Sequence, residues 1–418
     1  MGIRIGVIGG GASGMMAAIS AAKCGAKVTI LEGGERVGRK LLSTGNGKCN
    51  YSNQELSAEA YHCKNSIWLQ ESLDQFGAED AIRFFQGLGM LTKSKAGYLY
   101  PASEQASAVL DVLRNELTAS GVEVVTSCKV KELRLNKGEA RFAVSDGKHT
   151  FYFDKIVLAC GGKAAPKTGS DGSGFQLAKS LGLHILPTVP ALVQLTVQED
   201  YLKAVSGVRC EGEICVMREG DCLARECGEI QLTDYGISGI PTFQLSRTVN
   251  YVLLEQPKVR VILNLLPDMD EEAFETMIRS REKLKKHRTV EEFFTGVLNK
   301  KLMMLFIKLA GLKPGQPAAE APKEALRRVY ELCRHFELHV NGSKSYEQAQ
   351  VCAGGVDVAE VTATMEAVKV PGLYIIGEML DVDGRCGGYN LHWAWCSGYL
   401  AGRAAAEEQG TPGKKSER

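Results

Sequence analysis

The 418-residue sequence has no apolar run long enough to cross a bilayer. It also has no excess of charge of one sign, because 50 lysines and arginines stand against 49 acids and give a net charge of +1. A near-zero balance gives no support for binding to nucleic acid or to a membrane surface. We therefore expect a globular, cytoplasmic protein with neither a nucleic-acid partner nor a membrane partner.

The sequence also has no C-x-x-C pair, although it contains 13 cysteines. The densest group, Cys210 to Cys227, lies in an expected hairpin. Because Cys210 and Cys215 are an odd number of positions apart, they face opposite sides of one strand and are poorly placed to share a zinc ion. The sequence predicts free thiols in a reducing compartment and no metal site.

The first thirty-odd residues contain the strongest pattern that is present. Residues 3–8 are apolar and rich in β-branched side chains, which is typical of a buried strand. The G-x-G-x-x-G sequence of residues 9–14 follows at once. Residues 15–24 then read as a helix of small and apolar residues, and residues 27–31 as a second strand that ends at Glu32. A dinucleotide-binding βαβ unit requires this order of elements.

Each position in this unit has a physical reason. Gly9 permits a tight turn, Gly11 has no Cβ to keep a pyrophosphate away, and Gly14 lets the helix lie close to the sheet. The helix N-terminus offers N–H groups and the positive end of a dipole to phosphates. Glu32 is placed to accept hydrogen bonds from ribose hydroxyls. The predicted nucleotide-binding residues are Gly9, Gly11, Ala12, Ser13, Gly14 and Glu32.

Three later segments have a similar arrangement of strand, glycine and loop or helix. The glycine-rich, basic loop after Glu32 would pass over a bound dinucleotide, and we expect contacts from Arg39, Lys40, Thr44, Gly45, Asn46, Lys48, Cys49 and Asn50. A buried strand at residues 155–160 is followed by Gly161, and we expect Ala159 and Gly161 to contact the dinucleotide. A last strand, residues 372–376, leads to Gly377, Glu378, Asp381 and the helix-opening residues Gly388, Tyr389, Asn390 and Leu391.

The remaining patterns predict how the chain is divided. Residues 58–120 look mainly helical with a short extended stretch at residues 98–101, and residues 131–153 alternate like an antiparallel meander. Short alternating runs between residues 187 and 266 suggest an antiparallel β domain, and residues 268–334 are mostly helical. We therefore expect residues 1–187 with 352–418 to form a nucleotide-binding domain. Residues 188–267 with 335–351 would form an inserted β-rich domain, and residues 268–334 a helical insertion.

These motifs together resemble the two-dinucleotide-binding-domain flavoproteins. More narrowly, they are similar to the bacterial flavoprotein family that includes dehydro-bile-acid reductases and aminoacetone oxidases. The similarity extends over nearly the whole chain, and Gly-Gly-Tyr-Asn-Leu at residues 387–391 is its most specific element. The resemblance implies an α/β fold in which a Rossmann-like FAD-binding domain carries an inserted antiparallel β domain and a small helical domain.

The resemblance also implies how FAD is held. The glycine turn would face the pyrophosphate, Glu32 the ribose, and Val130 the adenine through its backbone. Lys40 and the loop at residues 44–50 would lie along the cofactor. Glu378 and residues 388–391 would surround the ribityl chain and the isoalloxazine, with the dipole of the last helix favouring a reduced flavin.

Two positions depart from the family pattern. Lys48 stands where arginine is frequent, which removes bidentate hydrogen bonding but keeps the charge. Asp234 stands where histidine is frequent, so substrate specificity does not transfer from relatives that carry the histidine.

The leading functional prediction is an FAD-dependent oxidoreductase. It would take hydride from NAD(P)H and pass it from flavin N5 to an electron-poor C=C bond of a small-molecule substrate, such as a steroid-like or bile-acid-like enone. The alternative is an aminoacetone-type flavin amine oxidase that uses oxygen and releases hydrogen peroxide. A third reading is a flavin-binding tRNA-modifying or regulatory protein. No catalytic residue is assigned, although Tyr389, Tyr235 and Asp234 are candidate proton donors. The sequence specifies neither the preference between NADH and NADPH nor the oligomeric state.

Overall fold

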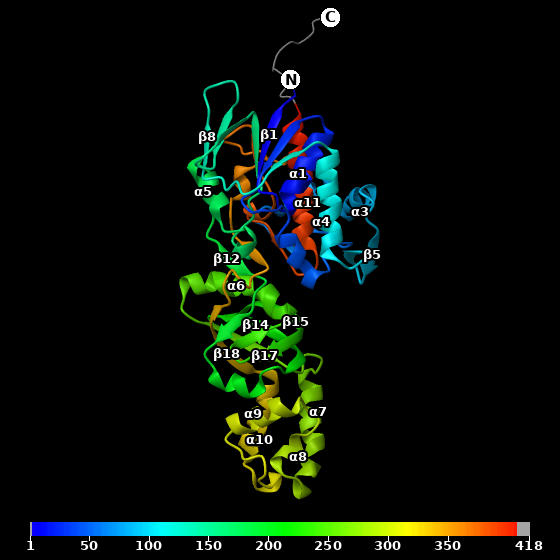
Figure 1. The fold of residues 1–418 in the computed structure, drawn as a ribbon. Helices are drawn as coiled ribbons and strands as arrows, with labels where there is room; N and C mark the ends of the chain where they lie inside the picture. Colours follow the sequence, from blue (N-terminus) through cyan, green and yellow to red (C-terminus); the bar gives the residue numbers. More distant parts are fainter. Residues whose placement is uncertain (1, 408–418) are drawn as a thin grey trace, which may run out of the picture. The chain divides into compact units, whose positions relative to one another are not determined.

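The computed structural model describes residues 2–407 and divides the chain into two compact units (Figure 1). The first, here called the sheet unit, comprises Met1–Thr188 and Val351–Arg418. The second, the barrel unit, comprises Val189–Gln350. Along this described stretch, the structure contains no helix with the length and apolarity needed to span a bilayer.

The sheet unit is built on a five-stranded parallel sheet. Its strands lie in the order β20 (Leu373–Ile375), β11 (Lys155–Leu158), β1 (Arg4–Ile8), β2 (Lys27–Leu31) and β7 (Glu123–Val125). The central strands are apolar and almost fully buried, as expected where helices or loops cover both faces of a parallel sheet. The chain therefore returns to this sheet after the barrel unit to add β20.

Two helices from opposite ends of the chain lie side by side in the sheet unit. These are α1 (Ala12–Lys23) and α11 (Tyr389–Ala406), coloured blue and red in Figure 1. A Cβ on Gly398 would lie 2.5 Å from the Ser13 carbonyl oxygen, and one on Gly402 would lie 2.4 Å from that of Ala17. The close approach of the two helices thus depends on glycine at these positions of α11.

The other elements of the sheet unit surround this core. The predicted meander is present as the antiparallel sheet β8–β9–β10. The prediction that residues 58–120 are mainly helical with an extended stretch at residues 98–101 agrees with α2, α3, α4 and β6, and β6 pairs with both β3 and β5. The strand β5 was not predicted, because its Thr-Lys-Ser-Lys sequence has no apolar alternation to indicate a strand. The elements are η1 (Lys40–Gly47), β3 (Ser52–Asn53), η2 (Ala58–Ala60), β4 (Tyr61–His62), α2 (Ser66–Gln75), α3 (Ala78–Gly87), β5 (Thr92–Lys95), β6 (Tyr98–Pro101), α4 (Ala106–Ala119), β8 (Glu132–Leu135), β9 (Phe142–Ser145), β10 (Thr150–Phe153), η3 (Pro166–Thr168), α5 (Ser173–Ser180), β19 (Val351–Ala353), η7 (Val358–Glu360), η8 (Gly377–Met379) and β21 (Asp383–Gly384).

The barrel unit contains a closed barrel of six strands. Their order is β13 (Leu195–Val197), β16 (Gly236–Ser238), β15 (Asp221–Leu232), β14 (Arg209–Arg218), β17 (Val259–Asn264) and β18 (Phe336–Ser343). The predicted antiparallel runs are present, but neither the closure nor the helix α6 (Ile240–Glu255) was predicted. The remaining elements before the helical part are β12 (Val189–Ala191) and η4 (Asp200–Val205).

The helical part of the barrel unit shares the barrel's core. Its elements are α7 (Glu271–Arg281), η5 (Glu282–His287), α8 (Val290–Phe294), α9 (Lys300–Leu309), η6 (Ala318–Glu320) and α10 (Lys323–Arg334). Helical and barrel side chains form one apolar cluster, and the ring of Phe306 on α9 lies 4.9 Å from that of Phe336 on β18. A separate helical domain remains a prediction.

One cysteine prediction is wrong. Cys215 and Cys222 form a disulfide with their Cα atoms 5.9 Å apart, a separation that suits a disulfide. The two residues lie on the neighbouring strands β14 and β15. The alternation of side chains along one strand does not reveal a cysteine partner across the hairpin.

Candidate cofactor site

The nucleotide motifs meet at one edge of the parallel sheet. Ile8 of β1 is level with Leu31 of β2 and with Leu158 of β11, and Leu158 is level with Ile375 of β20. The residues that follow these strands therefore start from the same carboxyl edge, where open α/β sheets bind ligands. They are Gly9, Glu32, Ala159 and, one residue later, Gly377.

The three motif glycines have different surroundings. Gly9 has a φ of +105°, and a Cβ on it would lie 2.5 Å from the Ala159 carbonyl oxygen. A Cβ on Gly14 would lie only 2.0 Å from the Gly9 carbonyl oxygen. A Cβ on Gly11, in contrast, would meet no atom of the described residues within 4 Å. Gly9 and Gly14 are therefore required by the fold, while Gly11 keeps open a space that a ligand can fill.

The N-terminus of α1 opens onto this space. Gly11 is its N-cap, so no side chain caps the helix, and its first turn contains no acid. Uncapped N–H groups and the positive end of the helix dipole favour an anionic ligand. Ala12 and Ser13 occupy this first turn, as the sequence analysis expected.

Glu32 lies at the same edge, with its carboxylate held by backbone groups. Its Oε2 accepts a hydrogen bond from Gly10 N at 2.7 Å, and its Oε1 accepts one from Gly34 N at 2.7 Å. The segment leading to Val130 runs alongside, since Cys128 N donates to the Glu32 carbonyl. Val130 is buried. This arrangement fits a carboxylate aimed at ribose hydroxyls beside a backbone that contacts a base.

The loop from Lys40 to Asn50 is held in an unusual conformation. Gly45, Asn46 and Cys49 have φ values of 55°, 52° and 55°, which is a region that non-glycine residues rarely adopt. Thr44 Oγ1 donates to the Leu41 carbonyl, and Cys49 N donates to the Thr44 carbonyl. Burial raises the pKa of the Cys49 thiol to about 12, so this cysteine is a neutral packing residue and not a nucleophile.

Asn50 presents an unsatisfied acceptor beside the start of α11. Its buried Oδ1 has no hydrogen-bond partner among the described residues. A Cβ on Gly388 would lie 2.7 Å from this oxygen. Because an unmade buried hydrogen bond is costly, the geometry fits a donor supplied by a bound group.

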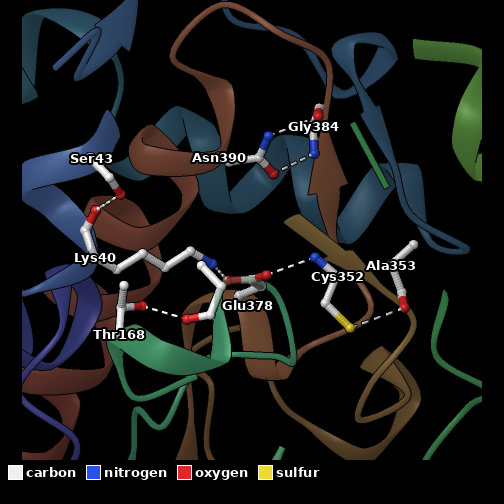
Figure 2. A network of polar contacts seen from close by, with 9 residues as sticks. Lys40, Ser43, Thr168, Cys352, Ala353, Glu378, Gly384 and Asn390 are labelled. Carbon is white, nitrogen blue, oxygen red and sulfur yellow. Dashed lines mark hydrogen bonds and ion pairs between the residues drawn. The ribbon is translucent and has the colours of Figure 1, made fainter. Parts of the chain in front are cut away.

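Glu378 is the centre of a charged contact (Figure 2). Its Oε2 accepts from Lys40 Nζ at 2.7 Å, and its Oε1 accepts from Cys352 N at 2.7 Å. Both side chains of the ion pair are largely buried, with 26% and 20% of their surface exposed. From their motifs, Lys40 and Glu378 were each expected to contact the cofactor, but in the structure they form an ion pair with each other. The structure also adds the backbone of Cys352, which no motif had indicated.

The start of α11 is fixed by its neighbours. Asn390 accepts from Gly384 N and donates to the Gly384 carbonyl, both at 2.8 Å (Figure 2). Its amide is therefore engaged with its own loop, and a cofactor contact would use its backbone. The N-cap Gly388 has a φ of 91°. Tyr389 begins the helix, and its ring packs edge-on against Tyr61. Leu391 follows in the first turn and is partly exposed.

Three residues that support this region were missed by the sequence analysis. Ser397 Oγ accepts from Gly377 N at 3.0 Å, and Trp395 Nε1 donates to the Tyr51 carbonyl at 2.9 Å. His392 is fully buried and bonds Ser52 Oγ and the Phe76 carbonyl. Burial lowers the pKa of His392 to about 4, so it is neutral at physiological pH. Polar residues inside a helix give no recognisable motif.

Other predicted site residues have protein partners. Arg39 donates to the Lys167 carbonyl, Lys48 pairs with Glu104, and Asp381 accepts from Gly354 N. Contacts of these three with a cofactor remain predictions. Gly161 also lies in the sheet unit, and a Cβ there would meet Ser170 Oγ at 2.7 Å.

Two of the candidate proton donors lie in the barrel unit. Asp234 is exposed, and the ring of Tyr235 lies under Lys344 Nζ at 3.8 Å. Among residues 2–407, no group of three histidine, cysteine or acidic side chains is arranged to hold a metal ion.

The residues present fit FAD. The cradle at Gly11 and the N-terminus of α1 suit the pyrophosphate, and the carboxylate of Glu32 suits the ribose. The unsatisfied Asn50 oxygen and the uncapped N-terminus of α11 provide a second polar site in the same unit. A dinucleotide with a polar group at each end matches this pair of sites.

Comparison with known proteins gives the same assignment. The model of a family described as the HI0933-like protein Rossmann domain matches residues 3–404. A 3-dehydro-bile acid delta(4,6)-reductase of Clostridium scindens is 42% identical over 97% of this chain and 99% of its own length. Ribosomal RNA dihydrouridine synthases of Haemophilus influenzae and Escherichia coli are 30% and 31% identical over 94% of this chain, and over 96% and 95% of their own lengths.

The family match spans the glycine turn, the carboxyl-edge residues and α11, and it continues through the barrel unit. The predicted flavoprotein family and the predicted fold class are thereby confirmed. As an FAD-dependent oxidoreductase with a Rossmann fold, the chain belongs to the HI0933-like family.

Proposed function

We propose that this protein reduces an electron-poor C=C bond in a small steroid-like molecule with hydride from NAD(P)H. The observation that carries the proposal is the 42% identity to the 3-dehydro-bile acid delta(4,6)-reductase, which extends over nearly all of both chains. An identity of this extent includes the cofactor site and the whole barrel unit, and not only the glycine turn.

The chain's own residues would bind and orient. The N-terminus of α1 would hold the pyrophosphate, and Glu32 would fix the adenosine end. The Lys40–Glu378 pair would set the charge beside the cofactor. When bound, FAD supplies the hydride-transfer chemistry.

Tyr389 is the proton donor that we propose to test. Of the three candidates it alone belongs to the sheet unit, where it begins α11. Its pKa is raised, mainly by burial and also by the neighbouring Tyr98, so it keeps its proton at neutral pH. A protonated phenol can deliver a proton to the carbon next to the one that receives hydride.

A second candidate function is reduction of the C5=C6 bond of uracil in RNA. It is favoured by the two relatives named ribosomal RNA dihydrouridine synthase. Dihydrouridine is uridine with this bond saturated, and in uracil the bond is conjugated to a carbonyl, as in an enone. Both candidates therefore require the same chemistry, a hydride added to an activated alkene, and differ in the molecule that must be bound.

Anaerobic stopped-flow absorbance can test the proposal. NADH or NADPH should bleach the bound flavin, and a dienone bile acid should restore its colour within one turnover. Restoration by a uracil-containing RNA, and not by the bile acid, would favour the second candidate.

Two further outcomes decide the broader class. Bleaching by aminoacetone together with peroxide release in air, and not by either nicotinamide, would establish the amine oxidase alternative. Protein that stays colourless after FAD addition would overturn every flavin-dependent reading.

Tyr389→Phe should slow the restoring step and leave the bleaching step unchanged.

A further inference from the structure

A dense group of basic residues lies in the helical part of the barrel unit. Between Arg279 and Arg288 there are six lysines and arginines, one histidine and a single acid, Glu282. The whole chain has a net charge of only +1. This ten-residue segment therefore carries more positive excess than the entire protein, and the overall balance conceals it.

The segment forms a short, exposed helical stretch. It runs from the last turn of α7 through η5 and ends just before α8 (Figure 1). Leu284 is partly buried, whereas Lys283, Lys286 and Arg288 are exposed. Because side chains three residues apart eclipse each other in a 3₁₀ helix, Lys283 and Lys286 project from the same side of η5.

Two of the six cations are bound by carbonyl or carboxylate groups of the protein. Arg281 donates to the carbonyls of Phe293 and Thr295, and Lys285 pairs with Glu282. The other four, which we call the basic patch, form no ion pair with a carboxylate of residues 2–407. They are Arg279, Lys283, Lys286 and Arg288, of which Arg279 donates a hydrogen bond to the Thr276 hydroxyl.

Three acids of the flanking helices α7 and α8 pair with other cations. Glu275 pairs with Arg327, Glu271 with Arg334, and Glu291 with Lys300. Glu292 feels the charge of Arg288, but its carboxylate is bound by the backbone N–H and hydroxyl of Thr289. The four cations are therefore exposed to solvent and form no ion pair within residues 2–407, although Arg279 and Arg288 interact electrostatically with Glu275 and Glu292.

Helix stabilisation explains only part of this arrangement. Basic residues in the last turn of α7 complement the helix dipole, which accounts for Arg279 and Arg281. Lys283, Lys286 and Arg288 lie beyond the end of α7, and like charges on one side of a helix repel each other. Packing and the dipole thus leave three exposed cations without a structural role.

We propose that the basic patch binds the phosphate backbone of a nucleic-acid strand. Phosphates spaced along a strand match several cations spaced along a helical stretch, and binding would release condensed counterions. A membrane surface fits less well, because the large hydrophobic side chains that the structure exposes do not include any in this segment. The patch carries no aromatic side chain to stack on bases, so binding depends on charge and not on sequence.

Fluorescence anisotropy tests the proposal with the flavin-loaded, full-length chain. The probes are a labelled 20-nucleotide RNA of mixed sequence and a DNA strand of the same sequence, titrated between 50 and 200 mM KCl. The test variant is K283E/K286E/R288E. Its matched control, K64E/K137E/K148E, reverses three exposed lysines of the sheet unit and changes the net charge equally.

For the wild type we expect log Kd to rise linearly with log salt. The test variant should bind at least tenfold more weakly at 50 mM salt, and its slope should fall by about 2, because each lost phosphate contact to a single strand removes about 0.7. The control variant should stay within threefold of the wild type. Stronger binding of RNA than of DNA would identify the partner as RNA, and equal binding would identify phosphate as the only group recognised.

Three results would overturn the proposal. The first is that the wild type binds neither strand at 50 mM salt. The second is that both triple variants weaken binding equally. The third is that vesicles containing phosphatidylserine bind the patch while the strands do not. Flavin absorbance and thermal melting of each variant separate lost binding from lost folding. Because binding is measured without turnover, its failure leaves the proposed reductase function untouched.

Discussion

The cofactor edge of the sheet unit and the core of the barrel unit are packed in different ways. At the closest contacts of the sheet unit, side chains are absent: Gly14 touches the Gly9 carbonyl, and Gly398 touches that of Ser13. The core of the barrel unit instead depends on large rings such as Phe306 and Phe336. Glycines at fixed spacing can be recognised in a sequence, whereas a large ring can fill a core in many ways. The difference explains why the sequence predicted the cofactor site but not the closure of the barrel.

The largest effect should come from emptying the barrel unit's core. Phe306 is fully buried, so Phe306→Ala leaves a cavity and should lower the free energy of unfolding by about 3–5 kcal/mol. Calorimetry of the flavin-loaded chain should show an earlier melting transition with flavin still bound. Release of flavin in that same transition would contradict the contrast, because the units would then unfold together.

A methyl group should affect stability at one glycine of the sheet unit and FAD binding at another. Gly14→Ala places a Cβ against the Gly9 carbonyl and should destabilise the chain by about 3 kcal/mol. Gly11→Ala, the matched control, should change stability by less than about 0.5 kcal/mol, because its Cβ meets open space. It should nevertheless weaken FAD binding at least tenfold, measured by flavin fluorescence. Equal affinity for FAD in Gly11→Ala would place the pyrophosphate elsewhere.

His392 should make the sheet unit sensitive to acid. The folded chain holds the pKa of this histidine near 4, below the ordinary value of 6.5. Between these two pH values the unfolded chain binds a proton that the folded chain does not. The contribution of His392 to the free energy of unfolding therefore has its full value above pH 6.5 and decreases as the pH falls towards 4. The loss at pH 4.5 should be about 2.5 kcal/mol.

Denaturant unfolding of wild type and His392→Gln at pH 7.5 and 4.5 measures this term. Carboxylates elsewhere lose stability equally in both proteins, so only the difference between the two proteins belongs to His392. An identical pH dependence would mean that the imidazole has the same pKa in the folded and the unfolded chain.

The smallest effect should come from the Lys40–Glu378 pair. Lys40→Met leaves a largely buried carboxylate with only the Cys352 N–H as partner, and should cost about 1–2 kcal/mol of stability. Lys40→Met/Glu378→Gln should recover part of that loss, because the second change removes the unpaired charge. Additive losses in this double-mutant cycle would show that the two side chains do not interact. FAD affinity and the visible flavin spectrum of each variant report whether the pair also acts on the cofactor.

The fold could be predicted where spacing alone determines geometry. Residues 3–32 contain strand, glycine turn, helix and acid within one short window, so local rules were sufficient. The Lys40–Glu378 contact could not be predicted in this way, because two strands far apart in sequence bring these residues to one edge. Asn390 was assigned to the cofactor by its motif, but motifs do not indicate that its amide closes a loop on Gly384.

Net charge is a limited predictor of binding for a different reason. Net charge averages over the whole chain, so it could not reveal a local patch such as residues 279–288. Which of those cations remain uncommitted depends on the positions of Glu271, Glu275 and Glu291, and only the folded chain supplies these. The expectation of no nucleic-acid partner therefore stays a prediction that the binding experiment will decide.

The contact between α1 and α11 has a consequence for synthesis. The helix that begins at Ala12 is translated well before Gly398 and Gly402, the glycines of α11 against which it packs. At ordinary elongation rates this delay is about 20–80 s. During that time the barrel unit is translated completely, while α1 waits with its packing face uncovered. A nascent chain arrested before residue 398 would therefore be a target for chaperones, and its first helix would be the exposed element.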